Sequence, residues 1–432
     1  MARKIGIIGI QTGDEGKGKV AEKLEREAAA RAILQGVVAN HAQPVGTMRF
    51  QGGGNAGHTI TLNGQAYKLH QIPSGILVPG TYNLCGERTF VDPQAAMVEI
   101  KKLRDLGILV TPDRLGIASN AHVTLAYHVA DSQESFQRER HTSTGRGIKE
   151  TATDKFNRVG LRLEDFFDEQ TFREAVQKRF PQGLPEQYGS IESFSASYDE
   201  ARTFLRPFSV LQSDAMLQHG THYWFGEGAQ GHRIDVDRGL YPGVTSSNPT
   251  VLPFAKPDKI LGVAKFYESS VGSDRPFVGK IQDEALEAAL RDEWGERGTT
   301  TGKDRDLGWF DAVAVRYAIE SCEIDHLVGT CGDRLEALAA RGEKVKLVVA
   351  YNIDGKRFDR WDPSFHNRRT LYTARPIFEE FEPWDKFIDA NGRVAPNAQR
   401  YVDRIQKLTG KEFAYLGTGP ESKDFLTLHD VL

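Results

Sequence analysis

The chain has 432 residues, which is long enough for two domains or for one large α/β unit with insertions. Hydrophobic residues make up 39% of it and charged residues 26%, the composition of a globular protein with a sizeable core. The formal net charge of −4 provides no global basic field, which argues against a nucleic-acid partner or an anionic membrane. Any recognition of phosphate must therefore depend on local groups.

The N-terminal residues and the cysteines indicate the cellular compartment of the protein. Residues 1–4 lead straight into a short apolar stretch, and neither a signal-peptide pattern nor an apolar span of about 18 residues follows. The three cysteines, Cys85, Cys322 and Cys331, form no CxxC motif. We therefore expect a cytoplasmic protein without a membrane segment or a disulfide framework.

In chain order, the sequence predicts helices and buried strands separated by short loops. The β-branched run 5–10 stops at 11–13 and predicts a buried parallel strand, and 20–30 is a strong helix by propensity. Residues 181–197 are rich in Pro, Gly and Ser and predict a surface excursion. The remaining predicted elements are helices at 94–106, 163–179, 283–297, 310–322 and 398–408, and strands at 327–329 and 345–350.

The order of these elements favours one α/β body. A strand, a glycine-rich turn and a helix open the chain, as in nucleotide-binding α/β folds. The sequence contains no internal repeat and no low-complexity linker. We predict a single domain over 1–432, with a central, mostly parallel sheet, flanking helices and inserted lobes.

The turn at 13–19, Gly-Asp-Glu-Gly-Lys-Gly-Lys, has the features of a phosphate-binding loop. Its glycines allow backbone N–H groups to approach phosphate oxygens, and the following helix adds the positive end of its dipole. Lys17 and Lys19 supply positive charge. The carboxylate of Asp14 would be repelled by phosphates unless it holds a metal ion or a substrate proton. The loop does not follow the common GxxxxGK[ST] pattern.

Six motifs, in order along nearly the whole chain, carry a resemblance to a known family. They are 11–19 (QTGDEGKGK), 50–59 (FQGGGNAGHT), 142–148 (TSTGRGI), 225–231 with 241–248, 298–302 with 308–309, and 417–420 (GTGP). Together they resemble the signatures of adenylosuccinate synthetases. The resemblance implies a P-loop-like GTP-binding fold and a homodimer.

The resemblance also implies a reaction. A ligase of this family joins L-aspartate to IMP through a 6-phosphoryl-IMP intermediate, with hydrolysis of GTP to GDP and phosphate, in the AMP branch of purine nucleotide biosynthesis. Asp14 would take the N1 proton, and His58 would act as the acid at O6. A carboxylate and an imidazole in one dry cleft can have their pKa values driven apart into base and acid. One Mg²⁺ would be held by Asp14 and the carbonyl oxygen of Gly57.

The same resemblance assigns further residues to each ligand. Lys17 and Gln230 complete the catalytic set. The acceptor nucleotide would contact Asp14, Glu15, Lys17, Asn55, Ala56, Gly57, His58, Thr144, Gln230, Thr245 and Lys303, and Arg158 lent by the partner subunit. GTP would contact Gly13, Asp14, Glu15, Gly16, Lys17, Gly18, Lys19, Gly57, His58, Thr59, Arg305, Cys331, Gly332, Asp333, Gly417, Thr418 and Gly419. L-Aspartate would contact Thr299, Thr300, Thr301, Gly302, Lys303 and Arg305.

The sequence departs from the family pattern at several of these places. The departures are Thr12 for tryptophan, Gly54 for histidine, Lys149-Glu150 for Gly-Pro, 303–306 (KDRD) for an arginine-rich run, Cys331 for lysine, and a longer segment around 40–44. They cluster around both nucleotides. Two alternatives therefore stay open: a divergent paralogue that aminates another purine nucleotide such as (d)GMP, with ATP as donor, and a catalytically silent guanine-nucleotide-binding protein. Retention of both Asp14 and His58 favours the ligase.

Overall fold

The structure is a computed structural model that describes residues 2–35, 43–139, 144–218, 221–271, 275–298 and 302–432. The remaining residues include Thr299, Thr300 and Thr301, the first two residues of the motif at 142–148, and most of the longer segment at 40–44. The sequence-based assignments made for them lie outside the described residues.

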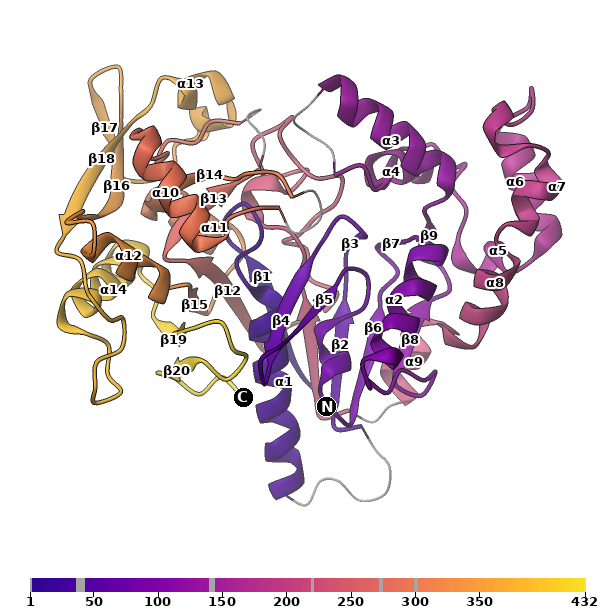
Figure 1. Ribbon diagram of the computed structural model, residues 1–432, viewed down its shortest axis with the longest axis horizontal. Helices are drawn as coiled ribbons and strands as arrows, with labels where there is room; N and C mark the ends of the chain where they lie inside the picture. Colours follow the sequence, from indigo (N-terminus) through magenta and orange to yellow (C-terminus); the bar gives the residue numbers. More distant parts are fainter. Residues whose placement is uncertain (1, 36–42, 140–143, 219–220, 272–274, 299–301) are drawn as a thin grey trace.

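A ten-stranded sheet runs through the middle of the molecule (Figure 1). Its strand order is β10-β8-β6-β2-β11-β1-β12-β15-β19-β20, and every neighbouring pair is parallel except β19 and β20. The strands are β1 (Arg3–Gly9), β2 (Val45–Arg49), β6 (Thr81–Cys85), β8 (Leu115–Ala118), β10 (Ser209–Val210), β11 (Tyr223–Glu227), β12 (Lys259–Lys265), β15 (His326–Thr330), β19 (Phe413–Gly417) and β20 (Phe425–Thr427). The predicted fold class is confirmed.

Burial on both faces explains why the strands are apolar throughout. Ile5 and Ile7 of β1 pack with Leu24 of α1 (Lys17–Leu34) in one hydrophobic cluster, whereas Ile8 and Ile10 belong to another on the opposite face. All four isoleucines are fully buried. The uninterrupted apolar run at 5–10 is therefore a strand covered from both sides.

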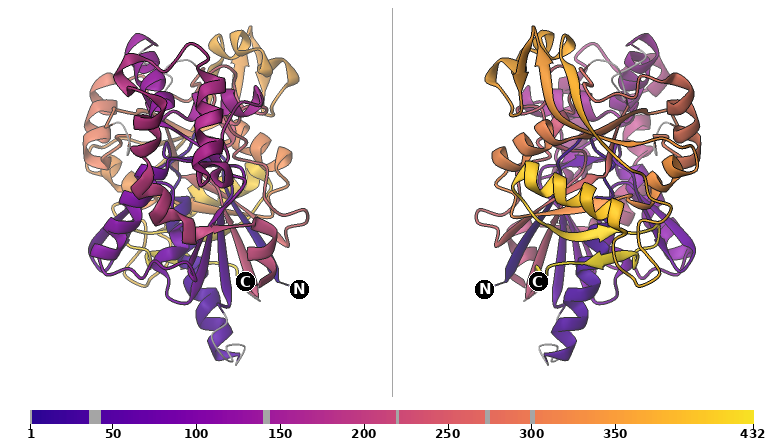
Figure 2. Two further views of the ribbon diagram at one scale, coloured as in Figure 1. Left: turned by 90° about the vertical axis from the view of Figure 1, so that its right-hand side faces the viewer. Right: turned by 90° about the vertical axis from the view of Figure 1, so that its left-hand side faces the viewer.

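Two further regions flank the central sheet. The region on one side contains a second sheet, formed by β13 (Tyr267–Ser270), β14 (Asp306–Asp311), β16 (Val345–Ile353), β17 (Lys356–Phe358) and β18 (Arg375–Phe381). The helices of this region are α10 (Glu284–Trp294), α11 (Ala312–Ser321), α12 (Glu336–Ala339) and α13 (Arg368–Tyr372). The right-hand view of Figure 2 shows this sheet above α14 (Pro396–Thr409). On the other side lie the helices α2 (Pro93–Asp105), α3 (Ala126–Glu139), α4 (Ile148–Phe156), α5 (Leu163–Phe166), α6 (Glu169–Arg179), α7 (Ile191–Ala196), α8 (Asp199–Leu205) and α9 (Gln212–Gln218).

Short elements complete the fold around the ends of the main strands. They are β3 (Gly52–Gly53), β7 (Thr89–Val91) and β9 (His122–Val123), the hairpin of β4 (His58–Leu62) and β5 (Gln65–Leu69), and the 3-10 turns η1 (Ser74–Leu77), η2 (Glu186–Tyr188), η3 (Arg206–Phe208), η4 (His232–Ile234), η5 (Asp333–Leu335) and η6 (Pro363–His366). In the part of the chain that the structure describes, no helix has the length and apolar character needed to cross a membrane.

Two predicted helices need correction. Residues 163–179 form two helices, α5 and α6, because Asp168 caps the second one by accepting a hydrogen bond from the N–H of Thr171 at 2.7 Å. The helix predicted at 310–322 begins only at Ala312, since 310 and 311 belong to β14 and Asp311 caps α11. Periodicity alone did not reveal these caps.

Candidate active site

Loops from distant parts of the chain meet at one edge of the central sheet. These loops follow β1, β2, β11, β12, β15 and β19. Hydrogen bonds join them: Nζ of Lys19 donates to the carbonyl oxygen of Gly419 (2.5 Å), and Oγ1 of Thr330 donates to the carbonyl oxygen of Glu15 (2.7 Å). Parallel strands bring their carboxyl ends to the same edge, which is where open α/β sheets bind ligands. The predicted site residues on these loops are thereby brought together.

The loop between β1 and α1 is held from within by the carboxylate of Glu15. Its Oε1 accepts hydrogen bonds from the N–H of Gly13 (2.8 Å) and of Gln11 (3.2 Å), and its Oε2 pairs with Nζ of Lys17 at 2.5 Å. Both charged side chains are buried. A Cβ at Gly9 would overlap Oε2 of Glu15, so only glycine leaves room there. Glu15 and Lys17 thus shape the loop.

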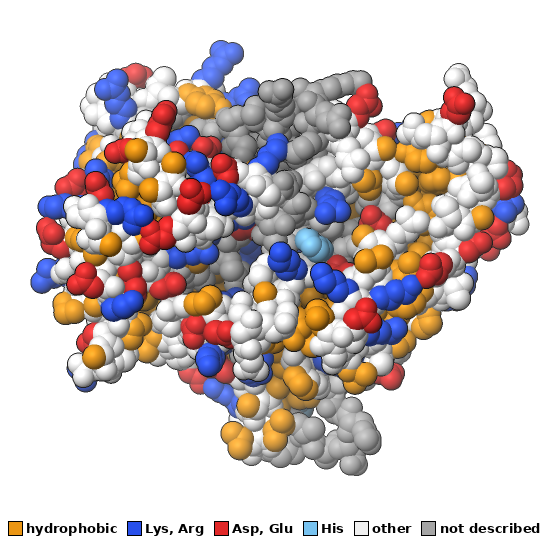
Figure 3. Space-filling model, in the orientation of Figure 1, with side chains coloured by type: hydrophobic (Ala, Val, Ile, Leu, Met, Phe, Trp, Pro, Cys, Tyr) orange, Lys and Arg blue, Asp and Glu red, His pale blue; other side chains and the backbone are white. Residues whose placement is uncertain are grey.

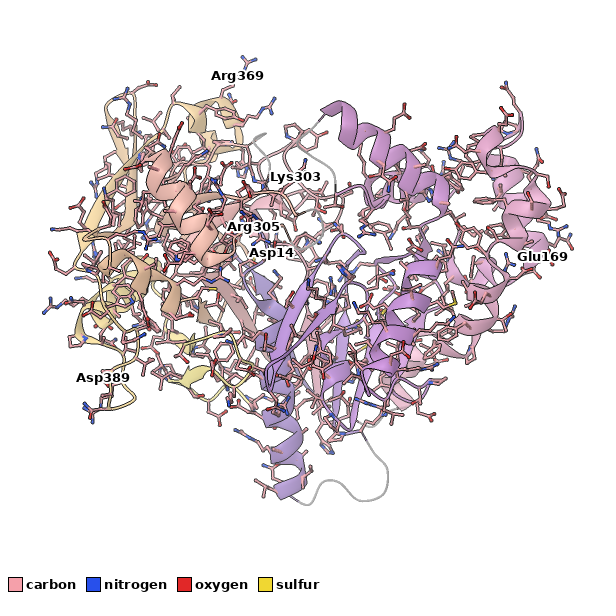
Figure 4. All side chains as sticks on the ribbon, viewed as in Figure 1. Asp14, Glu169, Lys303, Arg305, Arg369 and Asp389 are labelled. Atoms are coloured by element: carbon pink, nitrogen blue, oxygen red, sulfur yellow. The ribbon has the colours of Figure 1, made fainter. Side chains whose placement is uncertain are left out.

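Asp14 projects from this loop toward the guanidinium of Arg305, the residue just before β14. Its backbone is left-handed (φ 58°), and its side chain is 40% exposed. Nη2 of Arg305 pairs with Oδ2 of Asp14. Figure 4 shows Asp14, Arg305 and Lys303 together in the middle of the molecule, and Figure 3 shows Lys and Arg side chains gathered in the same area. Positive charge is therefore concentrated locally at this edge.

Arg305 is itself held by a buried acid, Glu296. Glu296 accepts from Arg305 Nη1 (2.6 Å), Lys265 Nζ (2.7 Å) and Arg334 Nη1 (2.6 Å). Burial alone would raise the pKa of Glu296, but the three cations hold it below its ordinary range. A continuous chain of ion pairs consequently runs from Asp14 through Arg305 and Glu296 to Arg334.

His58 lies against the first turn of α1 and is backed by a buried carboxylate. Its Nδ1 is 2.5 Å from Oε1 of Glu227, whose other oxygen accepts from the N–H of Ser74 at 2.7 Å. Nη1 of Arg49 lies 3.4 Å from Glu227. A Cβ at Gly18 would come within 2.8 Å of the Cβ of His58, so glycine allows this close approach.

The electrostatics of this pair favour a neutral imidazole beside an ionised carboxylate. Burial lowers the pKa of His58, and the charge of Arg49 lowers it further, while Glu227 opposes both. Burial works against ionisation of Glu227, but His58 and Arg49 hold its pKa below the usual value. Burial and the charge of Glu227 raise the pKa of neighbouring Glu25 well above its ordinary range, which favours the protonated form of Glu25. Glu25 accepts a hydrogen bond from Thr47 at 2.7 Å.

Small polar groups border the same edge. Gln230 has a left-handed backbone, and its Oε1 lies 3.1 Å from the place where a Cβ of Gly52 would be. Asn55 accepts from the N–H of Gly53 at 3.1 Å, and the N–H of Thr245 donates to the carbonyl of Ile234 at 2.8 Å. Ala56 is buried, whereas Asn55, Gly57, Thr144, Gln230, Thr245 and Lys303 are partly exposed.

The residues expected at the base of the donor nucleotide also cluster. Electrostatic contact joins Lys19 to Cys331 and Asp333, and burial lowers the pKa of Lys19 while these groups oppose the shift. Burial raises the pKa of Asp333. Gly332 packs against Phe387. The expected contacts Gly417, Thr418 and Gly419 continue from β19 beside Lys19, while Gly16 and Thr59 are exposed.

Arg158 lies apart from this cluster. It follows α4, has a left-handed backbone (φ 62°) and is exposed. Its neighbour Phe156 is 78% exposed, which is unusual for so large an apolar side chain. In one chain, then, Arg158 does not belong to the site that Asp14 and His58 define.

A Mg²⁺ ion would have few protein ligands here. Among the residues that the structure describes, no three His, Cys, Asp or Glu side chains are grouped to hold a metal ion. The partly exposed carboxylate of Asp14 and the carbonyl of Gly57 nevertheless fit Mg²⁺, because this ion keeps waters and takes its remaining ligands from phosphates. The guanidinium of Arg305 would have to leave Asp14 first, since the two cations repel each other.

Several residues at the site were not singled out from the sequence. They are Arg49, Glu227, Lys265, Glu296 and Arg334. Arg49, Glu227 and Lys265 are the last residues of the strands β2, β11 and β12. An ionisable residue that ends an otherwise apolar strand is costly to bury without a partner, so this pattern was an available signal for the carboxyl edge.

The fold and this edge define a nucleotide-binding α/β protein with a glycine-rich phosphate loop. A model of the adenylosuccinate synthetase family matches residues 6–426. The chain is 34% identical to the adenylosuccinate synthetase of Caldanaerobacter subterraneus over 98% of this chain and 99% of the relative. It is 35% identical to that of Streptococcus sanguinis over 96% of this chain and 95% of the relative.

Solved structures agree on the fold. The fully ligated adenylosuccinate synthetase of Plasmodium falciparum superposes with a TM-score of 0.83 at 24% identity, over 98% of this chain and 99% of the other. A succinoaminodeoxyadenylate synthetase of cyanophage S-2L, bound to dGMP and to dATP as an energy donor, gives a TM-score of 0.56 at 18% identity, over 99% of this chain and 95% of the other. The chain belongs to the adenylosuccinate synthetase family, whose members are ligases of purine biosynthesis.

Proposed function

We propose that this protein is an adenylosuccinate synthetase that uses IMP, L-aspartate and GTP. The single observation that carries the proposal is the placement of two side chains beside the phosphate loop: Asp14, which pairs with Arg305, and His58, which packs against Gly18 and lies beside Glu227. A protein that only binds a nucleotide needs neither a proton acceptor nor a proton donor there. Family membership supports the same reaction class.

The proposed chemistry proceeds in two steps. Asp14 accepts the N1 proton of IMP, and O6 attacks the γ-phosphorus of GTP, so that GDP leaves. The amine of L-aspartate then attacks C6, and phosphate leaves from the same carbon. In the ligand-free protein the imidazole of His58 is neutral, and the negative charge of the bound nucleotides would raise its pKa. As an imidazolium countered by Glu227, His58 then donates a hydrogen bond to O6 while negative charge builds on it.

The protein would hold its ligands with groups already at this edge. Arg305 would turn from Asp14 to a carboxylate of L-aspartate, for which a guanidinium is a bidentate partner. Mg²⁺, held by Asp14 and the Gly57 carbonyl, would neutralise the phosphates when bound. Asp333 would accept hydrogen bonds from the N1–H and 2-amino groups of guanine.

One assay distinguishes the candidate functions. Purified protein is incubated with L-aspartate, Mg²⁺ and each of IMP, GMP and dGMP, crossed with GTP and ATP, and the products are identified by mass spectrometry. We expect adenylosuccinate from IMP with GTP at the highest rate. A succinylated 2-aminopurine product would instead establish the second candidate, an enzyme acting on (d)GMP, which the open space around Gly54 and the likeness to the phage fold favour. No product from any pair would support a silent binder.

We also propose a homodimer in which Arg158 completes the partner's acceptor site. The exposed Arg158 and Phe156, outside the site of their own chain, support this arrangement. Mixing an Arg158→Ala chain with an Asp14→Asn chain should restore part of the activity, because one of the two sites in the mixed dimer keeps both residues. Absence of recovery, once subunit exchange has been shown by mass spectrometry, would contradict the shared site.

A further inference from the structure

A second concentration of positive charge lies in the segment 356–375, which has no place in the proposed reaction. It contains six Lys or Arg residues and two Asp residues, in a chain whose net charge is −4. We call the six the basic patch: Lys356, Arg357, Arg360, Arg368, Arg369 and Arg375. All six are exposed. Figure 4 shows Arg369 at the upper edge of the molecule, pointing outward and away from Asp14 and Arg305.

The fold fixes the spacing of part of this patch. Asn352 of β16 is paired with Arg357 of β17 and with Arg375 of β18. Directly paired residues point to the same face of a sheet, and neighbouring strands are about 4.8 Å apart, so the two arginines flank Asn352 about 10 Å from each other.

A cluster of packed aromatic side chains holds the rest of the segment against the sheet. The fully buried ring of Phe365 lies 5.3 Å from that of Phe358 in β17 and 5.4 Å from that of Trp361. Trp361 in turn stacks on Tyr317 of α11 at 4.8 Å and 9°. The basic side chains are thus carried on an ordered platform formed by β17, η6, α13 and the start of β18.

The segment keeps a net positive charge, with six basic and two acidic side chains, and Lys356 interacts electrostatically with one of the acids, Asp362. Residues 356–375 are all described, and the structure records no ion pair for any of the six side chains. At the other end of the same sheet, Lys346 pairs with Glu380 (3.5 Å) and Lys344 with Glu382 (3.2 Å). Exposed cations that repel one another are stabilised when a polyanion binds across them.

An exposed aromatic residue accompanies the patch. Tyr372, at the end of α13, is 54% exposed, and Arg368 and Arg369 belong to the same helix. Phosphate-binding arginines beside an exposed aromatic ring are what proteins use to bind single-stranded nucleic acids, whose unpaired bases stack on the ring.

We propose that this surface binds single-stranded nucleic acid, with phosphates on the basic patch and a base stacked on Tyr372. The whole-chain charge of −4 argues against such a partner only if charge is averaged over the surface, whereas the patch is local. The overall negative charge keeps the affinity modest and strongly dependent on salt.

The test measures fluorescence anisotropy of the full-length protein with labelled RNA and DNA oligomers of about 15 nucleotides and the same mixed sequence. We expect a Kd on the order of micromolar at about 50 mM salt, rising about 50-fold at about 200 mM if four phosphates are contacted. Binding of RNA, of DNA or of both at this affinity supports the proposal, and the ratio of the two Kd values shows which nucleic acid is preferred.

Variants locate the binding surface. Arg368→Glu with Arg369→Glu should weaken binding at least about 10-fold and flatten the salt dependence, and Tyr372→Ala should weaken it about 10-fold through lost stacking. The matched control, Arg400→Glu with Lys407→Glu, changes the net charge equally at exposed positions of α14 and should alter Kd by less than about twofold. All variants should keep the wild-type Tm and ligase activity.

Four results would overturn the proposal. The wild-type protein could fail to bind either oligomer under low salt, or the control variant could lose as much affinity as the patch variants. Saturating IMP and GTP could displace the oligomer, which would place it in the active site. Vesicles of phosphatidylserine and phosphatidylcholine could bind through the patch while both oligomers do not, which would identify an anionic membrane as the partner.

Discussion

The two sides of the candidate active site support their central residues in different ways. On one side, His58 contacts the carboxylate of Glu227, which is fully buried and anchored by the backbone of Ser74. On the other side, the partly exposed Asp14 contacts the guanidinium of Arg305, which immediately precedes β14. The candidate acid and the candidate base are thus each held by a charged side chain.

The difference between the sides indicates which one is ready for catalysis before ligands bind. The His58 side is already assembled, because its carboxylate cannot leave a buried position without losing several contacts. The Asp14 side must change, because Arg305 occupies the carboxylate on which the metal ion and the N1 proton are expected.

Loss of either central side chain should abolish turnover. Asp14→Asn removes the proton acceptor, and His58→Ala removes the donor at O6, each expected to lower kcat by about 10²–10⁴-fold. Steady-state rates and melting temperature are measured for each variant. A variant that keeps activity within about threefold of wild type, at unchanged Tm, would rule out the role assigned to that residue.

Removing the charge that backs His58 should reduce kcat and shift its pH dependence. Glu227→Gln takes away the group that raises the pKa of His58 against burial, so the pKa falls further and the imidazolium forms only at lower pH. We expect kcat near neutral pH to fall about 10–100-fold and its optimum to move to lower pH. The pH profile of kcat is the measurement.

A matched control for this prediction lies close by. Glu25 is buried near Glu227 and its raised pKa favours the neutral form, so Glu25→Gln preserves that form and keeps an acceptor for Thr47. It should leave the pH profile of kcat unchanged. An equal shift in both variants would mean that Glu227 acts only through general packing.

On the Asp14 side, the chain of ion pairs ends next to the guanine-reading position, and its residues should set donor preference. Leaving Asp333 unpaired over adenine should cost roughly 1–3 kcal/mol, so GTP is preferred but ATP is used. Asp333→Asn should favour xanthosine triphosphate by about 10-fold, because the amide can donate to a 2-oxo group. Cys331→Lys should lower the donor KM, since a long aliphatic stem covers one face of the base.

Competition between GTP, ATP and xanthosine triphosphate gives the ratios of kcat/KM for this prediction. Strict dependence on GTP that survives Asp333→Asn would show that guanine is recognised elsewhere. In that case the ion pairs through Arg334 and Glu296 would serve only to position Arg305.

The sequence predicted features formed by residues that are contiguous in the chain, and it missed contacts between residues that are far apart in the chain. The strand at 5–10, the phosphate loop and Asp14 follow one another in the chain, so propensity and glycine spacing were enough to identify them. The partner of Asp14 is 291 residues away, and only the folded sheet shows that Arg305 reaches it.

Buried ionisable residues show the same limitation. Glu227 lies within a motif that was identified, but its contact with His58 depends on β4 and β11 meeting at one edge. Most strands of the second sheet were missed as well. Strands β13 and β17 are short, β18 is partly exposed, and the end of β14 at 310–311 was assigned to a helix.

The smallest expected effect contrasts His58 with a second buried histidine that no carboxylate backs in the same way. His232 is 2% exposed, its Nε2 is 2.8 Å from Oγ of Ser321, and burial lowers its pKa to about 3. In the unfolded chain its pKa is about 6.5, so as pH falls below 6.5 the unfolded state takes up the proton first and stability is lost. At pH 6 the free energy of unfolding lost through His232 is about 1 kcal/mol, and the loss continues as the pH falls toward the folded pKa.

Urea unfolding at about pH 7.5 and pH 6 should show that His232→Gln, which cannot titrate, has a smaller decrease in the free energy of unfolding than wild type. The exposed His429→Gln serves as control and should leave the decrease unchanged. If wild type and His232→Gln lose stability equally over this interval, His232 does not titrate on unfolding, and the contrast with His58 is unsupported.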